Sequence, residues 1–177
     1  MANRKLTGVL LVGGASTRFG SPKALARFGE ETLAERAWRL LGDACDERIA
    51  VGKRADRLEL PFDVLDDGTD IRAPIAGVIA GLRAAHNEVV IVIPVDTPLL
   101  TKAAVYELAD ACRDVAVPAT GPLPGAYRRS TLSTLERALS AGRLALREAI
   151  AGLDVAVVDL DAVLLANVNT PDDVRRL

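Results

Sequence analysis

The chain has 177 residues, half of them hydrophobic but only 3% aromatic, and a formal net charge of −2. This length is enough for one domain with a substantial core and short for two, so we expect a single domain over residues 1–177. The near-neutral charge argues against nucleic acid and an anionic membrane surface as partners, and the apolar runs are too short to span a bilayer.

A glycine-rich stretch follows the first predicted strand. The apolar run from Leu6 to Val12 predicts a buried strand, and three glycines, Arg18 and Lys23 lie within the next eleven residues. Glycine lets backbone N–H groups face an anion, and the two cations can neutralise phosphate charge. We therefore predict a phosphate-binding loop, with a solvated glycine-rich turn as the alternative.

The spacing excludes two common phosphate loops. Five residues separate Gly14 from Gly20 and Lys23 lies three beyond, whereas a Walker loop has four residues and an adjacent lysine. Gly13 and Gly14 are adjacent, which breaks the dinucleotide pattern G-x-G-x-x-G.

Helical and strand patterns alternate along the rest of the chain. The spacing predicts a helix over 31–41 that stops at Gly42, and the continuous β-branched run over 89–95 predicts a central parallel strand covered on both faces. Together the patterns predict a three-layer α/β/α fold around a mostly parallel sheet. Further strands are expected at 48–51, 62–65, 115–117, 126–129 and 155–158, and further helices over 74–82, 105–112, 132–139 and 146–153 and from Pro171 on.

Two glycines in the helix that begins at Pro74 need an explanation. Gly77 and Gly81 are four residues apart and therefore share one helix face. Glycine is unfavourable inside a helix, so something is expected to approach this face closely. Either a tightly packed strand or a bound nucleotide would explain the pattern.

Polar residues follow several of the predicted strands. Ligands of parallel sheets bind beyond the carboxyl ends of the strands, so Gly13, Asp66, Asp67 and Asp96 are expected to converge on one crevice. Asp96 is suited to hold Mg²⁺, which takes few protein oxygens together with substrate phosphates. The alternative is that Asp96 caps the helix that starts near Thr101.

The segment over 167–173 also has two interpretations. Asn167 and Asn169 offer amide oxygens that could complete the coordination of a metal at Asp96. The same segment is typical of a turn and a helix start, with Thr170 as cap and Asp173 completing a capping box. Both can hold at once, with Asn169 facing the site.

Taken together, these motifs resemble the MobA-like molybdenum cofactor guanylyltransferases. The resemblance runs from Leu6 to the C-terminus and rests on five motifs, namely Leu11-Val12-Gly13-Gly14 through Lys23, Val64-Leu65-Asp66-Asp67, Pro74-Ile75-Ala76-Gly77, Pro94-Val95-Asp96-Thr97-Pro98 and Asn167-Val168-Asn169-Thr170-Pro171. It implies a Rossmann-like nucleotidyltransferase fold, Mg²⁺ as cofactor, and transfer of GMP from GTP to the phosphate of molybdenum-molybdopterin. It also makes transient contact with cofactor-delivery proteins or molybdoenzymes an expectation.

The resemblance also implies roles for particular residues. Arg18, Lys23 and Asp96 would be catalytic, with Lys23 and Arg18 on the phosphates and Asp96 on Mg²⁺. Asn167 and Asn169 would lie near the metal and the acceptor. The nucleotide would be bound by Leu11, Val12, Gly13, Gly14, Lys23, Asp67 and Asp96.

The chain departs from the family pattern at several positions. Val12 replaces the usual Ala, and Gly52 ends a strand where the guanylyltransferases often have Asn. Other departures, around Gly121 and after Gly142, fall on the acceptor side. Two alternatives follow: a cytidylyltransferase of the same superfamily that acts on molybdenum cofactor, and a nucleotide-binding accessory protein without turnover.

The remaining candidate residues favour a cytoplasmic protein without His or Cys chemistry. Cys45 and Cys112 stand far apart and are expected to be buried thiols, with a disulfide as the alternative. The N-terminal apolar run is too short for a signal-peptide core. His86, the only histidine, is expected at the surface at a helix end rather than in catalysis.

Overall fold

A seven-stranded sheet in the order β5-β4-β1-β6-β8-β7-β9 forms the centre of the molecule. The computed structural model describes residues 5–13 and 22–176. All strand pairs are parallel except the two made by β8, which confirms a mostly parallel sheet. The strands are β1 (Leu6–Leu11), β4 (Glu47–Gly52), β5 (Val64–Asp66), β6 (Val89–Pro94), β7 (Val115–Pro118), β8 (Gly125–Arg128) and β9 (Val155–Val158).

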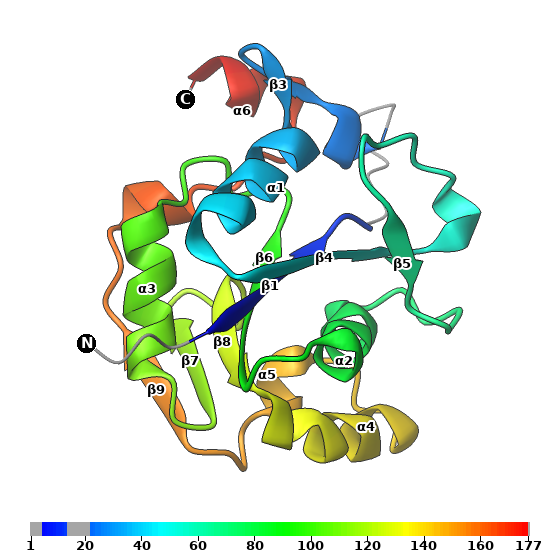
Figure 1. Cartoon of the computed structure of the whole chain (residues 1–177), viewed down its shortest axis with the longest axis vertical. Coiled ribbons are helices and arrows are strands. Elements are labelled where there is room, and N and C mark those ends of the chain that lie inside the picture. Colours follow the sequence, from blue (N-terminus) through cyan, green and yellow to red (C-terminus); the bar gives the residue numbers. More distant parts are fainter. Residues whose placement is uncertain (1–4, 14–21, 177) are drawn as a thin grey trace.

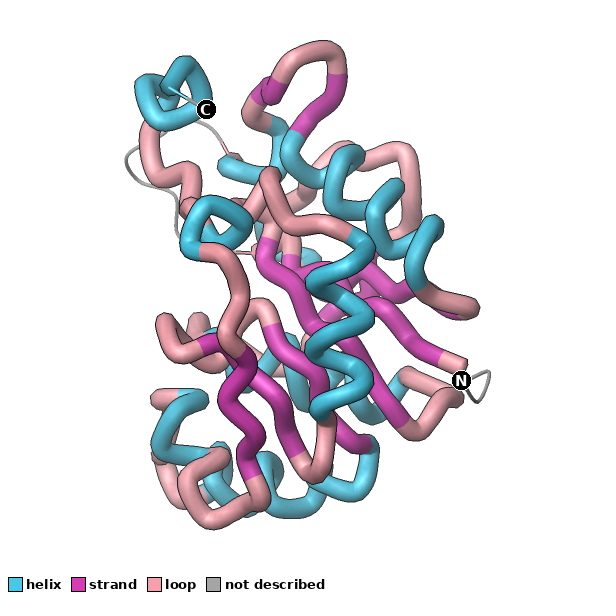
Figure 2. Tube along the Cα trace, turned by 90° about the vertical axis from the view of Figure 1, so that its left-hand side faces the viewer, coloured by secondary structure: helices cyan, strands magenta, loops and turns pink. Residues whose placement is uncertain are grey.

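Helices cover both faces of this sheet and give the predicted three layers (Figures 1 and 2). On one face α1 and α3 contact the strands and each other, and on the other α2 packs against the strands and against α4. A separate two-stranded hairpin of β2 (Arg27–Phe28) and β3 (Glu31–Thr32) precedes α1. The helices are α1 (Leu33–Ala44), α2 (Pro74–Ala84), α3 (Lys102–Ala111), α4 (Leu132–Ser140), α5 (Leu146–Ala149) and α6 (Pro171–Arg176).

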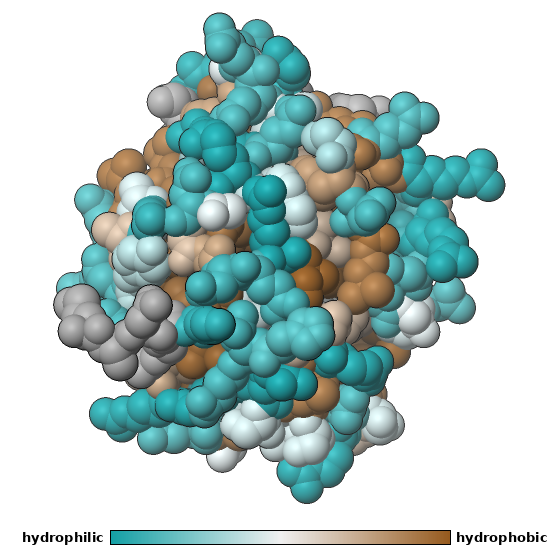
Figure 3. Space-filling model, in the orientation of Figure 1, coloured by the Kyte–Doolittle hydropathy of each residue, from teal (hydrophilic) through white to brown (hydrophobic). Residues whose placement is uncertain are grey.

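The core consists of two apolar clusters, one on each side of the sheet. Alternate residues of β1 point into different clusters: Leu10 packs with α1 and α3, and Val9 with α2. β6 is fully buried from Val89 to Ile93. Charged and polar side chains cover much of the face seen in Figure 3, with apolar residues between them. None of the helices in the described ranges is long and apolar enough to cross a membrane.

The structure decides between the two explanations of the glycines in α2. A Cβ added to Gly77 would lie 2.8 Å from Leu11 Cδ2, and one added to Gly81 would lie 2.6 Å from Val9 Cγ1. Both glycines therefore let α2 pack closely on β1. A closely packed strand, and not a nucleotide, explains the pattern.

The sequence predicted that the first helix stops at Gly42, and this prediction is wrong. A capping box between Thr32 and Glu35 sets the start of α1, which continues to Ala44. A Cβ at Gly42 would lie 2.5 Å from Arg48 Nη1, so this glycine makes room for a guanidinium rather than for a turn. Arg48 then lies over the ring of Trp38, with 4.4 Å from its Cζ to the ring centroid.

Two further expectations are corrected, and one alternative is excluded. The predicted helix over 146–153 is only the short α5, because the Asp154 N–H bonds Asp114 Oδ2 at 3.0 Å and turns the chain into β9. β6 is an inner strand but not a purely parallel one, since its second neighbour, β8, is antiparallel. Cys45 and Cys112 are not joined in a disulfide, so the disulfide alternative is wrong.

Candidate functional site

The predicted site residues gather at one edge of the sheet. β1, β4, β5 and β6 are mutually parallel neighbours, so their carboxyl ends lie side by side. Gly13 follows β1, Asp67 follows β5 and Asp96 follows β6. This arrangement confirms that the polar residues after these strands share one edge. Gly14 and Arg18 lie outside the described residues.

Three residues far apart in sequence meet beyond β1 and β6. Lys23 Nζ donates to Asp96 Oδ2 at 3.0 Å and to Asn169 Oδ1 at 3.0 Å. The side chains of Lys23 and Asp96 are 20% and 23% exposed, so the ion pair is shielded but open to a ligand. A lysine ammonium has three donors, and among the described residues these two contacts leave one of them for a further acceptor.

Backbone contacts hold each member of this group in place. Lys23 begins a short 3-10 helix, η1 (Lys23–Leu25), anchored by the buried Ala24. The Val168 N–H donates to the Asp96 carbonyl at 2.9 Å, and Val168 itself is fully buried. The C-terminal segment is therefore fastened directly to the loop that carries Asp96.

The capping box predicted after Asn169 is present together with the site contact. Asp173 Oδ2 accepts from the N–H groups of Asn169 and Thr170, at 2.9 and 2.8 Å, and Thr170 Oγ1 accepts from the Asp173 N–H. Hydrogen bonds from the Asn169 backbone and the Thr170 side chain lower the pKa of the Asp173 carboxyl. Asn169 thus faces Lys23 while its neighbour caps α6. Asn167 is exposed, and its side chain makes no hydrogen bond within the described ranges.

Asp96 is not a helix cap. Thr101 caps α3 instead, with its side-chain oxygen accepting from the Ala104 N–H at 3.3 Å. Asp96 Oδ1 accepts no hydrogen bond from any residue that the structure describes, whereas Oδ2 accepts from Lys23. One such carboxylate beside the amide oxygen of Asn169 fits the oxygen ligands that Mg²⁺ prefers.

Protein side chains alone would not complete a metal shell here. Among residues 5–13 and 22–176, no group of three His, Cys, Asp or Glu side chains is placed to hold a metal. Mg²⁺ commonly keeps waters and binds substrate phosphates besides one or two carboxylates. The donor set therefore fits a cation that arrives with a phosphate ligand.

The end of β1 packs closely on the end of β4. The Val12 N–H donates to the Val51 carbonyl at 2.9 Å, and Gly13 lies against Gly52 and Lys53. A Cβ at Gly52 would lie 2.9 Å from Val12 Cγ2. Two departures from the family pattern, Val12 and Gly52, are therefore in contact, and the larger residue fills the space that a side chain at position 52 would need. Leu11 and Val12 are buried.

Lys53 is a residue of this edge that the sequence analysis did not single out. Its Nζ lies 2.7 Å from Asp67 Oδ1 and also donates to the Thr69 carbonyl. The side chains of Lys53 and Asp67 are only 11% and 7% exposed. One feature of the sequence could have identified Lys53: it comes directly after a predicted strand. That strand is β4, which pairs with β5, the strand that ends at Asp66.

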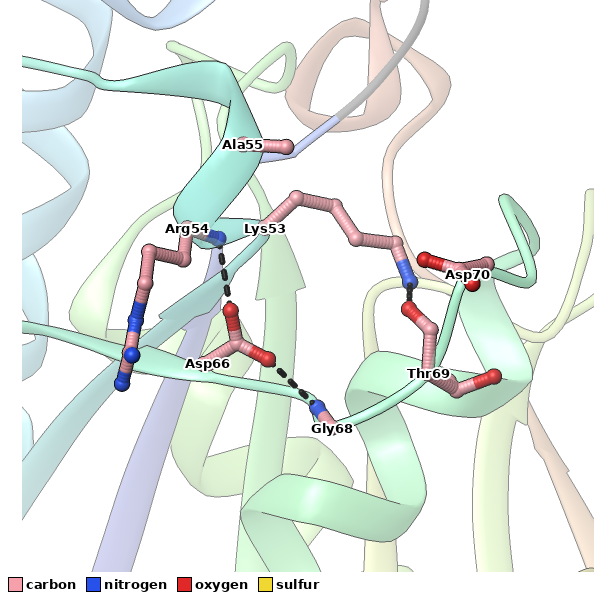
Figure 4. Close-up of a pocket in the computed structure, with 7 residues that line it drawn as sticks. All are labelled: Lys53, Arg54, Ala55, Asp66, Gly68, Thr69 and Asp70. Atoms are coloured by element: carbon pink, nitrogen blue, oxygen red, sulfur yellow. Dashed lines mark hydrogen bonds between the residues drawn. The ribbon is translucent and has the colours of Figure 1, made fainter.

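A pocket of about 290 Å³ opens beside this ion pair, lined by residues 53–55, Asp66 and residues 68–70 (Figure 4). Asp66 Oδ2 accepts from the Arg54 N–H and Oδ1 from the Gly68 N–H, both at 2.7 Å. These bonds lower the pKa of Asp66, chiefly through the Gly68 and Arg54 backbone. Gly68 has φ +74°, which a turn of this kind requires of glycine. Asp66 thus shapes the loop, and Asp67 is the carboxylate paired with a cation.

Comparison with known proteins agrees with this geometry. The family model of the MobA-like NTP transferase domain matches residues 8–157. A probable molybdenum cofactor guanylyltransferase from Chloroflexus aggregans is 32% identical over 96% of this chain and 92% of the relative. One from Opitutus terrae is 33% identical over 95% of this chain and 92% of the relative.

Solved structures show the same fold. Molybdopterin-guanine dinucleotide biosynthesis protein A from Archaeoglobus fulgidus superposes with a TM-score of 0.80 at 24% identity, over 96% of this chain and 95% of that one. A 2-C-methyl-D-erythritol 4-phosphate cytidylyltransferase from Thermus thermophilus gives 0.75 at 21% identity, with 95% of both chains covered. At this identity the likeness concerns the fold alone, and it spans enzymes that use different nucleotides.

Proposed function

Since the chain belongs to the MobA-like NTP transferase family, we propose that it is a molybdenum cofactor guanylyltransferase. It would transfer GMP from GTP to the phosphate of molybdenum-molybdopterin and release pyrophosphate. The observation that carries this proposal is the meeting of Lys23, Asp96 and Asn169 at the carboxyl end of the sheet. Curated relatives that match nearly the full chain bear this name.

The residues suit a displacement at the α-phosphorus of GTP. A phosphate oxygen of molybdopterin attacks this phosphorus, and the bond to the bridging oxygen of the β-phosphate breaks with its electron pair leaving on pyrophosphate. The attacking oxygen is already ionised, so no protein base is needed. His86 accordingly stands away from the site, with its side chain 86% exposed.

Lys23 would supply charge where the reaction needs it. Two of its donors are occupied by Asp96 and Asn169, which fix the direction of the ammonium, and the third is left for a phosphate oxygen. A group held in place before the reaction stabilises developing charge without having to reorganise. Mg²⁺ at Asp96 would add charge neutralisation at the reacting phosphates. The Gly13 backbone would face the nucleotide from the end of β1.

The remaining assignments complete this picture. Molybdopterin and GTP are the proposed small-molecule substrates, and transient contact with proteins that deliver or receive the cofactor follows from such a role. We place the reaction in the cytoplasm, where the thiols of Cys45 and Cys112 would stay reduced. Burial, helped by the Asp46 charge, raises the pKa of the Cys45 thiol to about 12.

A nucleotide panel tests the proposal. Purified protein, Mg²⁺ and molybdenum-molybdopterin are incubated with GTP, CTP, ATP or UTP, and pyrophosphate release is followed. We expect release with GTP and none at a comparable rate with the other three. Preference for CTP would make the protein a cytidylyltransferase of the same fold. Omission of the acceptor serves as the control for simple hydrolysis.

A further inference from the structure

Lys53 and Asp67 form an ion pair that is more deeply buried than that of Lys23 and Asp96, and the proposed reaction gives Lys53 no role. Both side chains are about nine-tenths buried or more, against roughly four-fifths for Lys23 and Asp96. Placing two charges this deep costs free energy unless their partners are well arranged. The hydrogen bonds of Lys53 and Asp67 therefore indicate which role this buried pair can have.

The two oxygens of Asp67 are used unequally. Oδ1 accepts from Lys53 Nζ at 2.7 Å and from the Thr69 N–H at 3.2 Å. No residue in the described part of the chain donates to Oδ2. Lys53 Nζ also donates a second hydrogen bond, to the Thr69 carbonyl. The carboxylate is thus fixed through one oxygen, and the other is left for a donor from outside.

This pair lies close to Gly13, just past the end of β1. An added Cβ at Gly13 would be 3.7 Å from Gly52 Cα and 4.0 Å from the Lys53 nitrogen. Asp67 is joined to the same strand end, because its N–H donates to the Gly52 carbonyl at 3.1 Å. Lys53 also lines the pocket in Figure 4, in which its side chain reaches toward Thr69.

We propose that Lys53 is a positioning residue for the nucleoside: it holds Asp67 so that Oδ2 accepts a hydrogen bond from an O–H or N–H group of the ribose or base. This inference rests on the proposed function, because it assumes that a nucleoside triphosphate binds at this edge. We assign the phosphate contact to Lys23 and not to Lys53, because the Lys53 side chain is only 11% exposed against 20% for Lys23, and both hydrogen bonds of Lys53 go to residues 67–69. Lys23 binds phosphate, and Lys53 acts through Asp67 on the other part of the nucleotide.

A comparison of two ligands separates these roles. Isothermal titration calorimetry in Mg²⁺ would measure the Kd of GTP and that of inorganic tripolyphosphate, which carries the phosphates without the nucleoside. The proteins are the wild type, Lys53→Met, Asp67→Ala and the Lys53→Met/Asp67→Ala double variant. Lys23→Ala is the control for a phosphate ligand, and Arg83→Met removes an ion pair to Glu136 between α2 and α4, outside the site.

Lys53→Met and Asp67→Ala should each weaken GTP roughly tenfold to a hundredfold, as expected for loss of a hydrogen bond to a charged group, and leave tripolyphosphate unchanged. The double variant should bind GTP as Asp67→Ala does. Lys23→Ala should weaken both ligands, and Arg83→Met neither. If Lys53→Met folds poorly because Asp67 is left unpaired, the double variant removes both charges, and its comparison with Asp67→Ala still decides the role.

Three results would overturn the assignment of Lys53: equal loss of GTP and tripolyphosphate affinity, a double variant weaker than Asp67→Ala, or unchanged GTP affinity in Lys53→Met. The first would make Lys53 a phosphate ligand, the second a direct nucleoside contact and the third a purely structural residue. A wild-type protein that bound neither ligand would instead overturn the proposed function, and the inference with it.

Discussion

Two polar clusters lie at opposite ends of the same three strands, β1, β4 and β6. At the amino ends, Thr7, Glu47, His86 and Asn87 bond to one another. Glu47 Oε2 accepts from Thr7 Oγ1, at 2.5 Å, and from the His86 N–H. Glu47 Oε1 lies 2.5 Å from His86 Nδ1. The Asn87 side chain donates to Thr7 Oγ1. At the carboxyl ends, Lys23 and Asp96 bond to each other and still have a donor and an oxygen to spare within the described residues.

The difference shows which polar cluster serves structure and which serves binding. In the amino-end cluster both Glu47 oxygens are occupied, and Thr7 is completely buried. A closed network of this kind satisfies buried groups and leaves nothing for a ligand. The carboxyl-end cluster is incomplete by itself. The four predictions below test this contrast.

The largest effect is expected for Asp96→Ala. Loss of the carboxylate that would hold Mg²⁺ should lower GMP transfer by at least a hundredfold to a thousandfold, the scale for removing one preorganised electrostatic group. Transfer of label from α-labelled GTP measures this. The melting temperature should stay close to that of the wild type, because Asp96 is partly exposed and caps no helix. Retained Mg²⁺-dependent turnover would remove Asp96 from the metal site.

Lys23→Ala should weaken GTP binding by about 1.5–3 kcal/mol, as for the loss of a charge-assisted hydrogen bond. The same change deprives Asp96 and Asn169 of their shared partner. Calorimetric titration with GTP and Mg²⁺ measures the loss. An unchanged dissociation constant would mean that the third donor of Lys23 does not meet a phosphate.

Glu47→Ala should lower stability and leave GMP transfer unchanged, the opposite of what is expected for Asp96→Ala. It leaves the hydroxyl of the buried Thr7 without its acceptor, which we expect to cost about 1–3 kcal/mol of unfolding free energy. Urea unfolding measures this cost. GMP transfer per folded molecule should stay at the wild-type level, and a loss comparable to that of Asp96→Ala would show that the two ends of the strands are not separate in function.

The smallest effect concerns pH. Burial raises the pKa of Glu47, but hydrogen bonds from the His86 backbone, Thr7 and the His86 ring outweigh it and bring the pKa below its usual value. Stability from a lowered carboxyl pKa is present above the unfolded value and is lost as the pH falls through the folded one. Unfolding free energy measured from neutral pH to below pH 4 should fall less steeply in Glu47→Gln. Parallel curves would contradict the closed network.

Much of the fold could be predicted because its signals are local. The β-branched run of β6 and the Pro74 start of α2 depend on neighbouring residues. The end of α1 was predicted wrongly because Gly42 is explained by Arg48, which reaches it from β4. A glycine that makes room for a side chain from another element looks like a helix stop in the sequence.

At the site, too, residues within local motifs could be predicted, and contacts between separate elements could not. Lys23, Asp96 and Asn169 could be named from motifs. The rule that ligands bind beyond strand ends placed Asp96 together with Gly13 and Asp67. Lys53 was missed because its partner, Asp67, is on another strand and no motif joins the two. The packing of Val12 against Gly52 was likewise invisible as a pair, although each was noted as a departure.

The most direct test of the account is single-turnover transfer from α-labelled GTP to molybdenum-molybdopterin with Mg²⁺, with wild type, Asp96→Ala and Glu47→Ala compared at equal folded concentration. The account predicts label in a molybdopterin dinucleotide, with one pyrophosphate released per label, for the wild type and Glu47→Ala but not for Asp96→Ala. Tight binding of GTP and Mg²⁺ by the wild type without transfer, where a known guanylyltransferase is active, would contradict it and identify a binding protein without turnover.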